Sequence, residues 1–240
     1  MNLDLEGKNN PNVKLCSVCG LKKELTYEHL PPKAAFNSNP VVMKDLRHIT
    51  KLGGNLYGKS KRRPRGMGDY KLCKECNNLT GSWYASEYSS YVQDLVKEMK
   101  NNVGNERALI KLKIRPLNFL KQVLVIMLCA DQALGQLRET ISESNFILDK
   151  YCKILDEKIC VYNFITFQPE HVLCGLTFIM DDLGSRNIAQ FVFRPLGFFL
   201  TYDSHISENG LMNITNYKNF NYDEEYEMQL QVDLSRVELT

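Results

Sequence analysis

The sequence contains no apolar run of the roughly 18 residues that a membrane-spanning helix requires. Its first residues also lack the basic stretch followed by an apolar stretch that marks a secretory signal peptide. No internal repeat and no low-complexity tract is present, which excludes fibrous repeat proteins. With 44% hydrophobic and 24% charged residues, the 240-residue chain can bury one sizeable core or two modest ones. We therefore expect a folded, soluble, cytoplasmic protein with no membrane partner.

The chain has eight cysteines, and in a reducing compartment cysteines are metal ligands or buried thiols more often than disulfide partners. Four of them form two Cys-x-x-Cys pairs, Cys16–Cys19 and Cys73–Cys76. Zinc suits this set because it accepts four thiolates without redox change. Such a site has no open position, so the predicted zinc is structural; the alternative is four free thiols. The cysteines without paired spacing are predicted to be buried thiols: Cys129, Cys152, Cys160 and Cys174.

The net charge of +2 is small, but its distribution along the chain is uneven. Residues 1–104 carry 17 Lys plus Arg against 10 Asp plus Glu, an excess of +7. Residues 105–240 carry 13 Lys plus Arg against 18 Asp plus Glu, a net charge of −5, so the two parts together give the overall value. We therefore predict two domains, 1–104 and 105–240, and an anionic partner, nucleic acid being the commonest, for the first.

Hydrophobic periodicity predicts an α+β fold with a mostly antiparallel sheet in the second domain. In the first domain we expect a short strand at 25–27, a long basic glycine-rich loop at 37–69 and a helix at 79–100. In the second domain we expect helices at 116–137 and 142–155, and strands at 110–115, 160–167, 172–180, 188–202 (interrupted at Pro195-Leu196-Gly197) and 228–234.

Three further residues have the chemistry of a hydrolytic site. Glu28 and His29 are adjacent in the predicted short strand, and Asn77 directly follows the second cysteine pair. Closing the zinc site would therefore bring Asn77 near the other two. A carboxylate and an amide oxygen suit Mg²⁺ or Mn²⁺, and a neutral imidazole can take a proton from water at neutral pH. Taken singly, the same residues have a second interpretation, a surface Glu–His pair and a helix-capping Asn.

These segments form one combined pattern: Cys16-x-x-Cys19, then Glu28-His29-Leu30-Pro31-Pro32-Lys33, then Leu72-Cys73-x-x-Cys76-Asn77. The pattern, over residues 14–90, resembles the zinc-containing branch of the HNH, or ββα-metal, endonucleases, which includes the recombination endonuclease VII of phages and the McrA-like restriction nucleases. The resemblance implies an N-terminal ββα-metal domain with the acid–His pair on the first strand, and a helix after the second strand.

The resemblance also implies roles for individual residues. Glu28 and Asn77 would hold one Mg²⁺ or Mn²⁺, and His29 would be the general base for a water that attacks a phosphodiester, most often in DNA. An antiviral defence role is a further expectation from the resemblance, because members of the resembled family act in host defence. The chain departs from the pattern where relatives carry an Asn shortly before the second cysteine pair, since Asn55 is only a distant substitute, and where a further ligand follows the Asn, since Thr80 and Gly81 stand there.

The predicted basic loop supplies candidate contacts to phosphates. These residues are Lys59, Lys61, Arg62, Arg63 and Arg65, and the alternative is a solvated loop. The aromatic residues of the predicted helix at 79–100 offer stacking surfaces, but their helical spacing favours the domain core: Trp83, Tyr84, Tyr88 and Tyr91.

Two alternatives to a nuclease stay open, a non-catalytic zinc-stabilised nucleic-acid-binding module and a protein-interaction adaptor. Three histidines lie outside any motif, namely His48, His171 and His205. The segment Tyr202-Asp203-Ser204-His205 lacks the nucleophile elbow that would indicate a catalytic triad. The second domain could select the target, form a homodimer or bind a regulatory partner.

Overall fold

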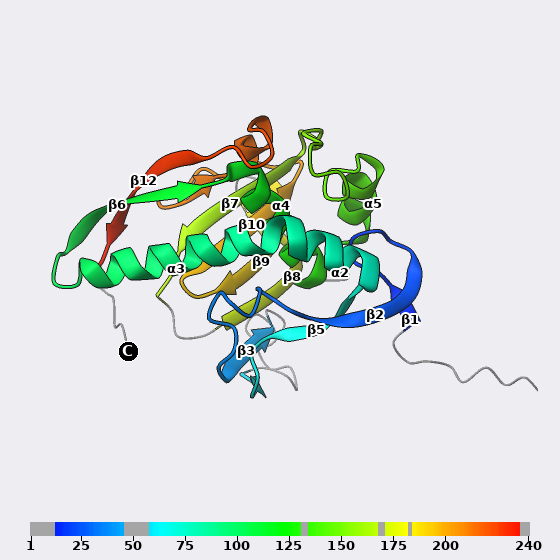
Figure 1. Cartoon of the computed structure of the whole chain (residues 1–240), viewed down its shortest axis with the longest axis horizontal. Coiled ribbons are helices and arrows are strands. Elements are labelled where there is room, and N and C mark those ends of the chain that lie inside the picture. The colour runs from blue at the N-terminus through cyan, green and yellow to red at the C-terminus, as the bar shows by residue number, and fades with distance from the viewer. Residues whose placement is uncertain (1–12, 46–57, 131–133, 168–170, 182–183, 236–240) are drawn as a thin grey trace, which may run out of the picture.

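The computed structural model describes residues 13–45, 58–130, 134–167, 171–181 and 184–235. These residues form a mixed α/β structure in which nearly all strand pairs are antiparallel, as the sequence predicts. Figure 1 shows helices α3 (Ser86–Asn101) and α4 (Pro116–Ala130) lying over one face of a large sheet, with a smaller sheet at one end. No helix among the described residues is long and apolar enough to cross a membrane.

The smaller sheet contains three strands in the order β1-β2-β5. These strands are β1 (Val13–Leu15), β2 (Lys22–His29) and β5 (Gly68–Cys73), and both pairings are antiparallel. The strand predicted at 25–27 is confirmed within the longer β2. Helix α2 (Lys74–Thr80) begins directly after β5, so the second cysteine pair spans the end of a strand and the first turn of a helix.

The large sheet has the strand order β11-β7-β10-β9-β8-β3-β4. Its strands are β3 (Val41–Asp45), β4 (Lys61–Arg63), β7 (Ile159–Ile165), β8 (His171–Asp181), β9 (Gly184–Phe193), β10 (Leu196–Tyr202) and β11 (Met212–Asn213). Among the described strands of this sheet, β3 and β8 form the parallel pair. The break predicted at Pro195 is confirmed as the turn between β9 and β10.

The prediction of one long loop over 37–69 is wrong for its described part. β3 and β4 lie within that stretch and pair with each other, and β5 begins at its end. The strands escaped prediction because β3 is a short apolar run and β4, Lys61–Arg63, has no apolar residue to create a period-two pattern. A charged edge strand of this kind is recognised through its partner and not through its own sequence. Residues 46–57, including His48 and Asn55, lie outside the described residues.

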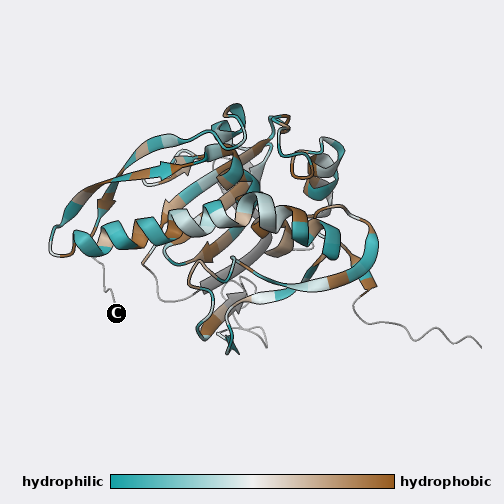
Figure 2. Cartoon of the chain, in the orientation of Figure 1, coloured by the Kyte–Doolittle hydropathy of each residue, from teal (hydrophilic) through white to brown (hydrophobic). Residues whose placement is uncertain are grey.

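The helix predicted at 79–100 is confirmed, although the helical segment begins earlier. Helix α2 continues through a π-helical turn, Gly81–Ala85, into α3 (Ser86–Asn101). One face of α3 is buried, and Figure 2 shows the alternating hydrophilic and hydrophobic bands of an amphipathic helix. Tyr84, Tyr88 and Tyr91 are buried, so the predicted core role of these tyrosines is confirmed, whereas Trp83 is half-buried.

Two helix predictions in the second stretch need correction. Helix α4 (Pro116–Ala130) ends before the predicted 137, and a separate helix, α5 (Gly135–Glu143), follows. No helix occupies 144–155; turns cover 144–151, irregular chain follows, and Asn145 near the start has a φ of 55°. A left-handed residue ends a right-handed helix, and a periodic pattern does not reveal it. The last strand, β12 (Tyr226–Asp233), pairs with β6 (Arg107–Ile114) in a separate two-stranded sheet.

One hydrophobic cluster includes residues from both predicted domains, from the cysteine-containing turn near Val18 to Leu234 at the end of β12. Helix α4 is mostly apolar and buried on all sides, and it contacts α3 as well as strands β8 and β9. β3 and β4, from the first stretch, extend the large sheet formed by the second. The boundary proposed at residue 104 stays a prediction; that residue lies in the turn between α3 and β6.

Candidate metal centre and active site

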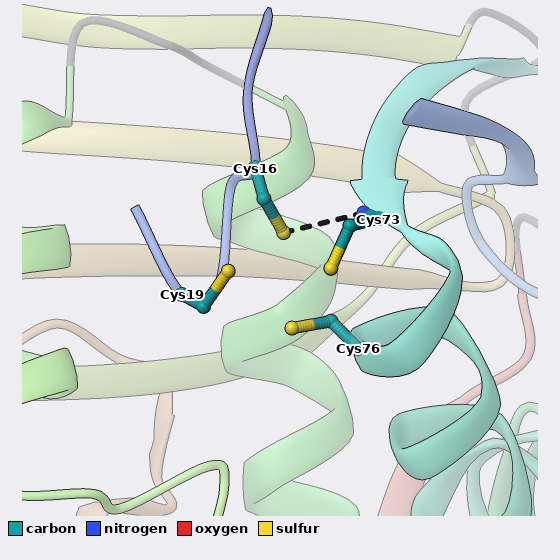
Figure 3. Close-up of side chains that lie close together, drawn as sticks. All are labelled: Cys16, Cys19, Cys73 and Cys76. Carbon is teal, nitrogen blue, oxygen red and sulfur yellow. Dashed lines mark hydrogen bonds between the residues drawn. The ribbon is translucent and has the colours of Figure 1, made fainter. Parts of the chain in front are cut away.

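The four cysteines of the two Cys-x-x-Cys pairs converge at the end of the small sheet. Their sulfur atoms all lie within 4.8 Å of one another, and Figure 3 shows the four side chains pointing toward one centre. Cys16 and Cys19 lie in the turn between β1 and β2, Cys73 ends β5, and Cys76 lies in the first turn of α2. The predicted convergence of these cysteines is confirmed.

Backbone hydrogen bonds hold the first cysteine pair in a tight turn. The N–H of Gly20 donates to the carbonyl of Cys16 at 3.0 Å, and Gly20 has a φ of 69°, a conformation that glycine adopts without strain. The N–H of Ser17 donates to the carbonyl of Lys71 in β5 at 2.9 Å. The N–H of Cys73 donates to Sγ of Cys16 at 3.3 Å, so the two pairs are bonded to each other across the cluster.

The donor set fits a structural zinc ion. Tetrahedral coordination at about 2.3 Å places neighbouring sulfurs roughly 3.8 Å apart, which agrees with four sulfurs inside 4.8 Å. A hydrogen bond from the Cys76 thiol lowers the pKa of Cys16 to about 4, whereas burial raises the pKa of Cys73 to about 11. Burial and crowding therefore disfavour four thiolates together, and a cation is the group that would allow all four to ionise.

Helix α5, from the second stretch of the chain, clamps the same turn. Nε of Arg138 donates to the carbonyl of Ser17 at 3.0 Å, and Oγ of Ser142 donates to the carbonyl of Val18 at 2.8 Å. Arg138 is buried, so this is a charge-assisted hydrogen bond from its guanidinium to a backbone carbonyl inside the protein. The sequence does not reveal this contact, since both acceptors are backbone atoms more than a hundred residues away along the chain.

Glu28 and Asn77 lie in contact on the small sheet and helix α2. Burial raises the pKa of the half-buried Glu28 carboxyl above its ordinary value, and the neighbouring Asn77 side chain and His29 backbone N–H offset part of that shift. Nδ2 of Asn77 also donates to Oγ1 of Thr26 at 3.0 Å. A carboxylate and an amide group from segments 49 positions apart thus lie close together, where the sequence predicts that the His29 imidazole converges with them as well.

His29 has different neighbours. It is the last residue of β2, and its half-buried ring meets the Tyr27 ring edge-on, with 5.3 Å between ring centroids. Successive side chains of a strand point to opposite faces, so His29 shares a face with Tyr27 while Glu28 turns toward Asn77. The structure brings Glu28 and Asn77 together and leaves the imidazole against Tyr27, at the end of the same strand.

Asn37 is a site residue that sequence reasoning missed. Its side chain is fully buried, and Nδ2 donates to the carbonyls of Pro31 at 2.6 Å and Met67 at 2.8 Å, while Oδ1 accepts from the N–H of Met67 at 2.6 Å. It therefore ties the segment after His29 to the residue before β5. Because the partners of the Asn37 side chain are backbone atoms, which every residue has, no spacing of residue types in the sequence reveals these bonds. One clue is Gly66, where any Cβ would overlap the backbone and side-chain oxygens of Asn37.

The five predicted phosphate contacts lie on or beside one strand. Lys61, Arg62 and Arg63 form β4, the edge of the large sheet, with Lys59 before it and Arg65 after it. All are exposed except Arg63, which is half-buried. Only four residues separate the end of β4 from Gly68, which pairs with His29 across the small sheet. The basic strand therefore leads directly into the strand opposite the Glu28–His29 pair.

The remaining cysteines are those predicted to be buried thiols. Cys129 and Cys160 are buried as predicted, and Cys152 is half-buried. Burial raises the pKa of the Cys129 thiol, and its neighbours Cys16 and Glu28 raise it further, so this thiol lies beside the site. The exposed His205 is not isolated, because its Nδ1 lies 3.3 Å from Sγ of Cys160. The side chains of Cys174 and His171 lie outside the described residues.

The site thus contains a four-sulfur cluster, a Glu–Asn pair beside it and a histidine at the adjoining strand end. Comparison of the chain with protein-family models, with curated proteins and with solved structures gives no match. Function is therefore inferred from these residues and their geometry.

Proposed function

We propose that the protein is a metal-dependent endonuclease of the HNH type that hydrolyses phosphodiester bonds, with DNA as the first substrate to test. The observation that carries the proposal is that Glu28 and Asn77, from two distant segments, lie beside each other next to the cysteine cluster. His29 follows Glu28 at the end of the same strand. The three residue types match the pattern of the resembled family.

The local chain order supports the proposal. β2 and β5 are antiparallel, α2 follows β5 without a linker, and the cysteine cluster fastens the turn before β2 to the start of α2. This is the strand, strand and helix order that the resemblance implies. The second strand and helix supply Asn77, and the first strand supplies Glu28 and His29.

Each side chain has a task in this proposal. Oxygens of Glu28 and Asn77 would hold Mg²⁺ or Mn²⁺; burial, which raises the pKa of the Glu28 carboxyl, disfavours its anion, and a cation there would stabilise it. When bound, the cation would supply charge stabilisation to the phosphate and to the departing 3′ oxygen. The His29 imidazole, on the other face at the strand end, accepts the proton of the attacking water. The cysteine-bound zinc only supports the scaffold.

The basic edge strand β4 supplies backbone contacts in the same proposal. Lys61 and Arg62 are exposed, and exposed cations beside a phosphate contribute affinity without sequence selectivity. Replacing both by Gln should reduce the slope of log affinity against log salt concentration by about 2 on duplex DNA. An unchanged slope would remove this strand from the interface.

A plasmid assay tests the hydrolytic proposal. Zinc-loaded wild-type protein should nick supercoiled plasmid with Mg²⁺ or Mn²⁺, and His29→Ala should slow nicking by roughly 100- to 10,000-fold. His205→Ala, at an exposed histidine remote in sequence from the motif, is the matched control and should cut like the wild type. Because His29 is half-buried at a strand end, its removal should leave the melting temperature nearly unchanged. Equal nicking by His29→Ala and wild type would contradict the assignment.

A second candidate is a non-catalytic nucleic-acid-binding module with the same zinc site. The observation that favours it is the contact of His29 with Tyr27, on the strand face away from Asn77. This candidate predicts that DNA is retained on the protein at low salt while neither DNA nor RNA is cut with any divalent cation. Cleavage that depends on His29 would exclude it.

A further inference from the structure

Two exposed tyrosines form a pair on the small sheet. Tyr27 of β2 and Tyr70 of β5 are directly opposite in the strand register. Their ring centroids are 5.6 Å apart in an edge-to-face arrangement, and each residue is 43% exposed. Tyr27 in turn meets the His29 ring edge-on. The three rings therefore form a continuous row that ends at the proposed general base.

The backbone makes room for this row. A Cβ at position 68 would lie 2.5 Å from the Tyr27 hydroxyl, so a larger residue there would displace the tyrosine. Gly68 is the register partner of His29, so the Tyr27 ring fills the space at Gly68 directly across the strand pair from the histidine. An aromatic ring over a strand glycine stabilises the pairing, yet here both tyrosines keep almost half of their surface in solvent.

Exposed rings near cationic side chains are suited to nucleobases. Every base has a flat π-face, and stacking on an aromatic side chain does not depend on sequence. The bases of an intact duplex are stacked on one another, so only an unpaired base has a face to offer. The exposed cations of β4, four residues before β5 in the chain, supply the contacts to phosphates that such a strand needs.

We propose that the Tyr27–Tyr70 pair stacks an unpaired base next to the phosphate that His29 addresses, so that the substrate class is nucleic acid with a single-stranded segment at the cleavage position. The part of this inference that concerns the cleavage position rests on the proposed nuclease function. Its binding part is independent, because base stacking requires neither the divalent cation nor the imidazole.

Binding is measured with zinc-loaded His29→Ala protein, without Mg²⁺ or Mn²⁺, so that no strand is cut. The probes are a 2-aminopurine-labelled single-stranded oligonucleotide and its duplex at the same ionic strength. Tyr70→Ala should weaken single-strand binding by roughly 5- to 100-fold and abolish the 2-aminopurine quenching, with duplex binding unchanged. Tyr70→Trp should retain both. Tyr151→Ala, which removes a more exposed tyrosine (66%) outside the row, is the matched control and should behave as the parent protein.

The outcomes separate the two proposals. Equal loss of single-strand and duplex binding in Tyr70→Ala, or the same loss in Tyr151→Ala, overturns the stacking inference. Wild-type protein that cuts duplex and single strands equally, with Tyr70→Ala equally active, also overturns it while leaving the proposed hydrolysis intact. Tyrosine-dependent single-strand binding by a protein that cuts nothing supports stacking and overturns the hydrolytic function.

Discussion

Two corners of the molecule use the same elements, β2, β5 and α2, in different ways. The cysteine corner is formed by Cys16, Cys19, Cys73 and Cys76, and the carboxylate corner, for which we propose hydrolysis, by Glu28, His29 and Asn77. The cysteine corner is held by backbone hydrogen bonds and by side chains from α5. The carboxylate corner is half-buried, and burial raises the pKa of its carboxyl. The tightly packed cysteines stabilise the fold, whereas the partly solvated oxygen and nitrogen atoms of Glu28, His29 and Asn77 stay accessible to ligands.

This contrast predicts that changes at the first corner lower stability, whereas changes at the second lower activity. Asn37 and α5 lie between the two extremes, because neither touches the reacting groups but both fix the segments that carry them. Substitutions can therefore test the division of roles, beginning with the one expected to have the largest effect.

Cys73→Ser should remove the metal and unfold much of the chain. Structural zinc sites of this kind contribute roughly 10 kcal/mol or more of apparent binding energy, most of which requires all four ligands. Because α5 bonds the cysteine turn, we expect the loss to reach the second stretch as well as the first. Metal content, melting temperature and hydrogen exchange of α5 measure this. Cys152→Ser, at a half-buried cysteine outside the cluster, should keep one zinc per chain; equal metal loss in both variants would refute the assignment.

Asn37→Ala should lower the free energy of unfolding by about 3 kcal/mol, since it leaves the buried Pro31 carbonyl and Met67 N–H without their partner and removes one of two hydrogen bonds to the Met67 carbonyl. Chemical denaturation measures the effect, and Asn105→Ala, at an exposed asparagine, should be nearly neutral. Zinc content should be unchanged, while nicking of plasmid should fall because the segment after His29 is released. A variant as stable as the wild type would show that this amide does not connect the two segments in solution.

Lys121 belongs to neither corner and should report on the core alone. Burial lowers its pKa to about 8, although Nζ donates to the carbonyls of Asp149 and Lys150. Between about pH 8 and the ordinary value of 10.5, the unfolded chain binds more protons than the folded one, so stability should rise with pH. The slope should be at most about 1.4 kcal/mol per pH unit. Lys121→Met should abolish it; an identical slope in that variant would mean that another group titrates.

Ser142→Ala should have the smallest effect, about 1 kcal/mol, because it removes one hydrogen bond to the carbonyl of Val18. Zinc affinity, measured by competition with a chelator, should fall together with stability. Ser82→Ala, whose exposed hydroxyl bonds only to a carbonyl of its own helical segment, is the matched control. Weaker zinc binding in Ser142→Ala but not in Ser82→Ala would show that α5 supports the metal site.

Local sequence patterns predicted the elements in which residue type or spacing alone indicates a buried face or a turn. The spacing of apolar positions along α3 identified its buried face, and Pro195 located the turn between β9 and β10. By contrast, β4 contains only Lys and Arg and depends on β3 for its pairing, so no local pattern marks it. The segment after α5 has helix-forming composition, but Asn145 in the left-handed conformation ends the helix. Asn37 escaped notice because its partners are backbone atoms.

The sequence by itself determined the four-cysteine cluster, because two Cys-x-x-Cys pairs carry their chemistry and half of their geometry in local spacing. It also supplied the three side chains that we propose for hydrolysis. Only the tertiary structure decided that Glu28 meets Asn77 while His29 lies against Tyr27, and that α5 clamps the cysteine turn. The physical reason is that strand register and long-range hydrogen bonds depend on the packing of the whole core, which no short segment specifies.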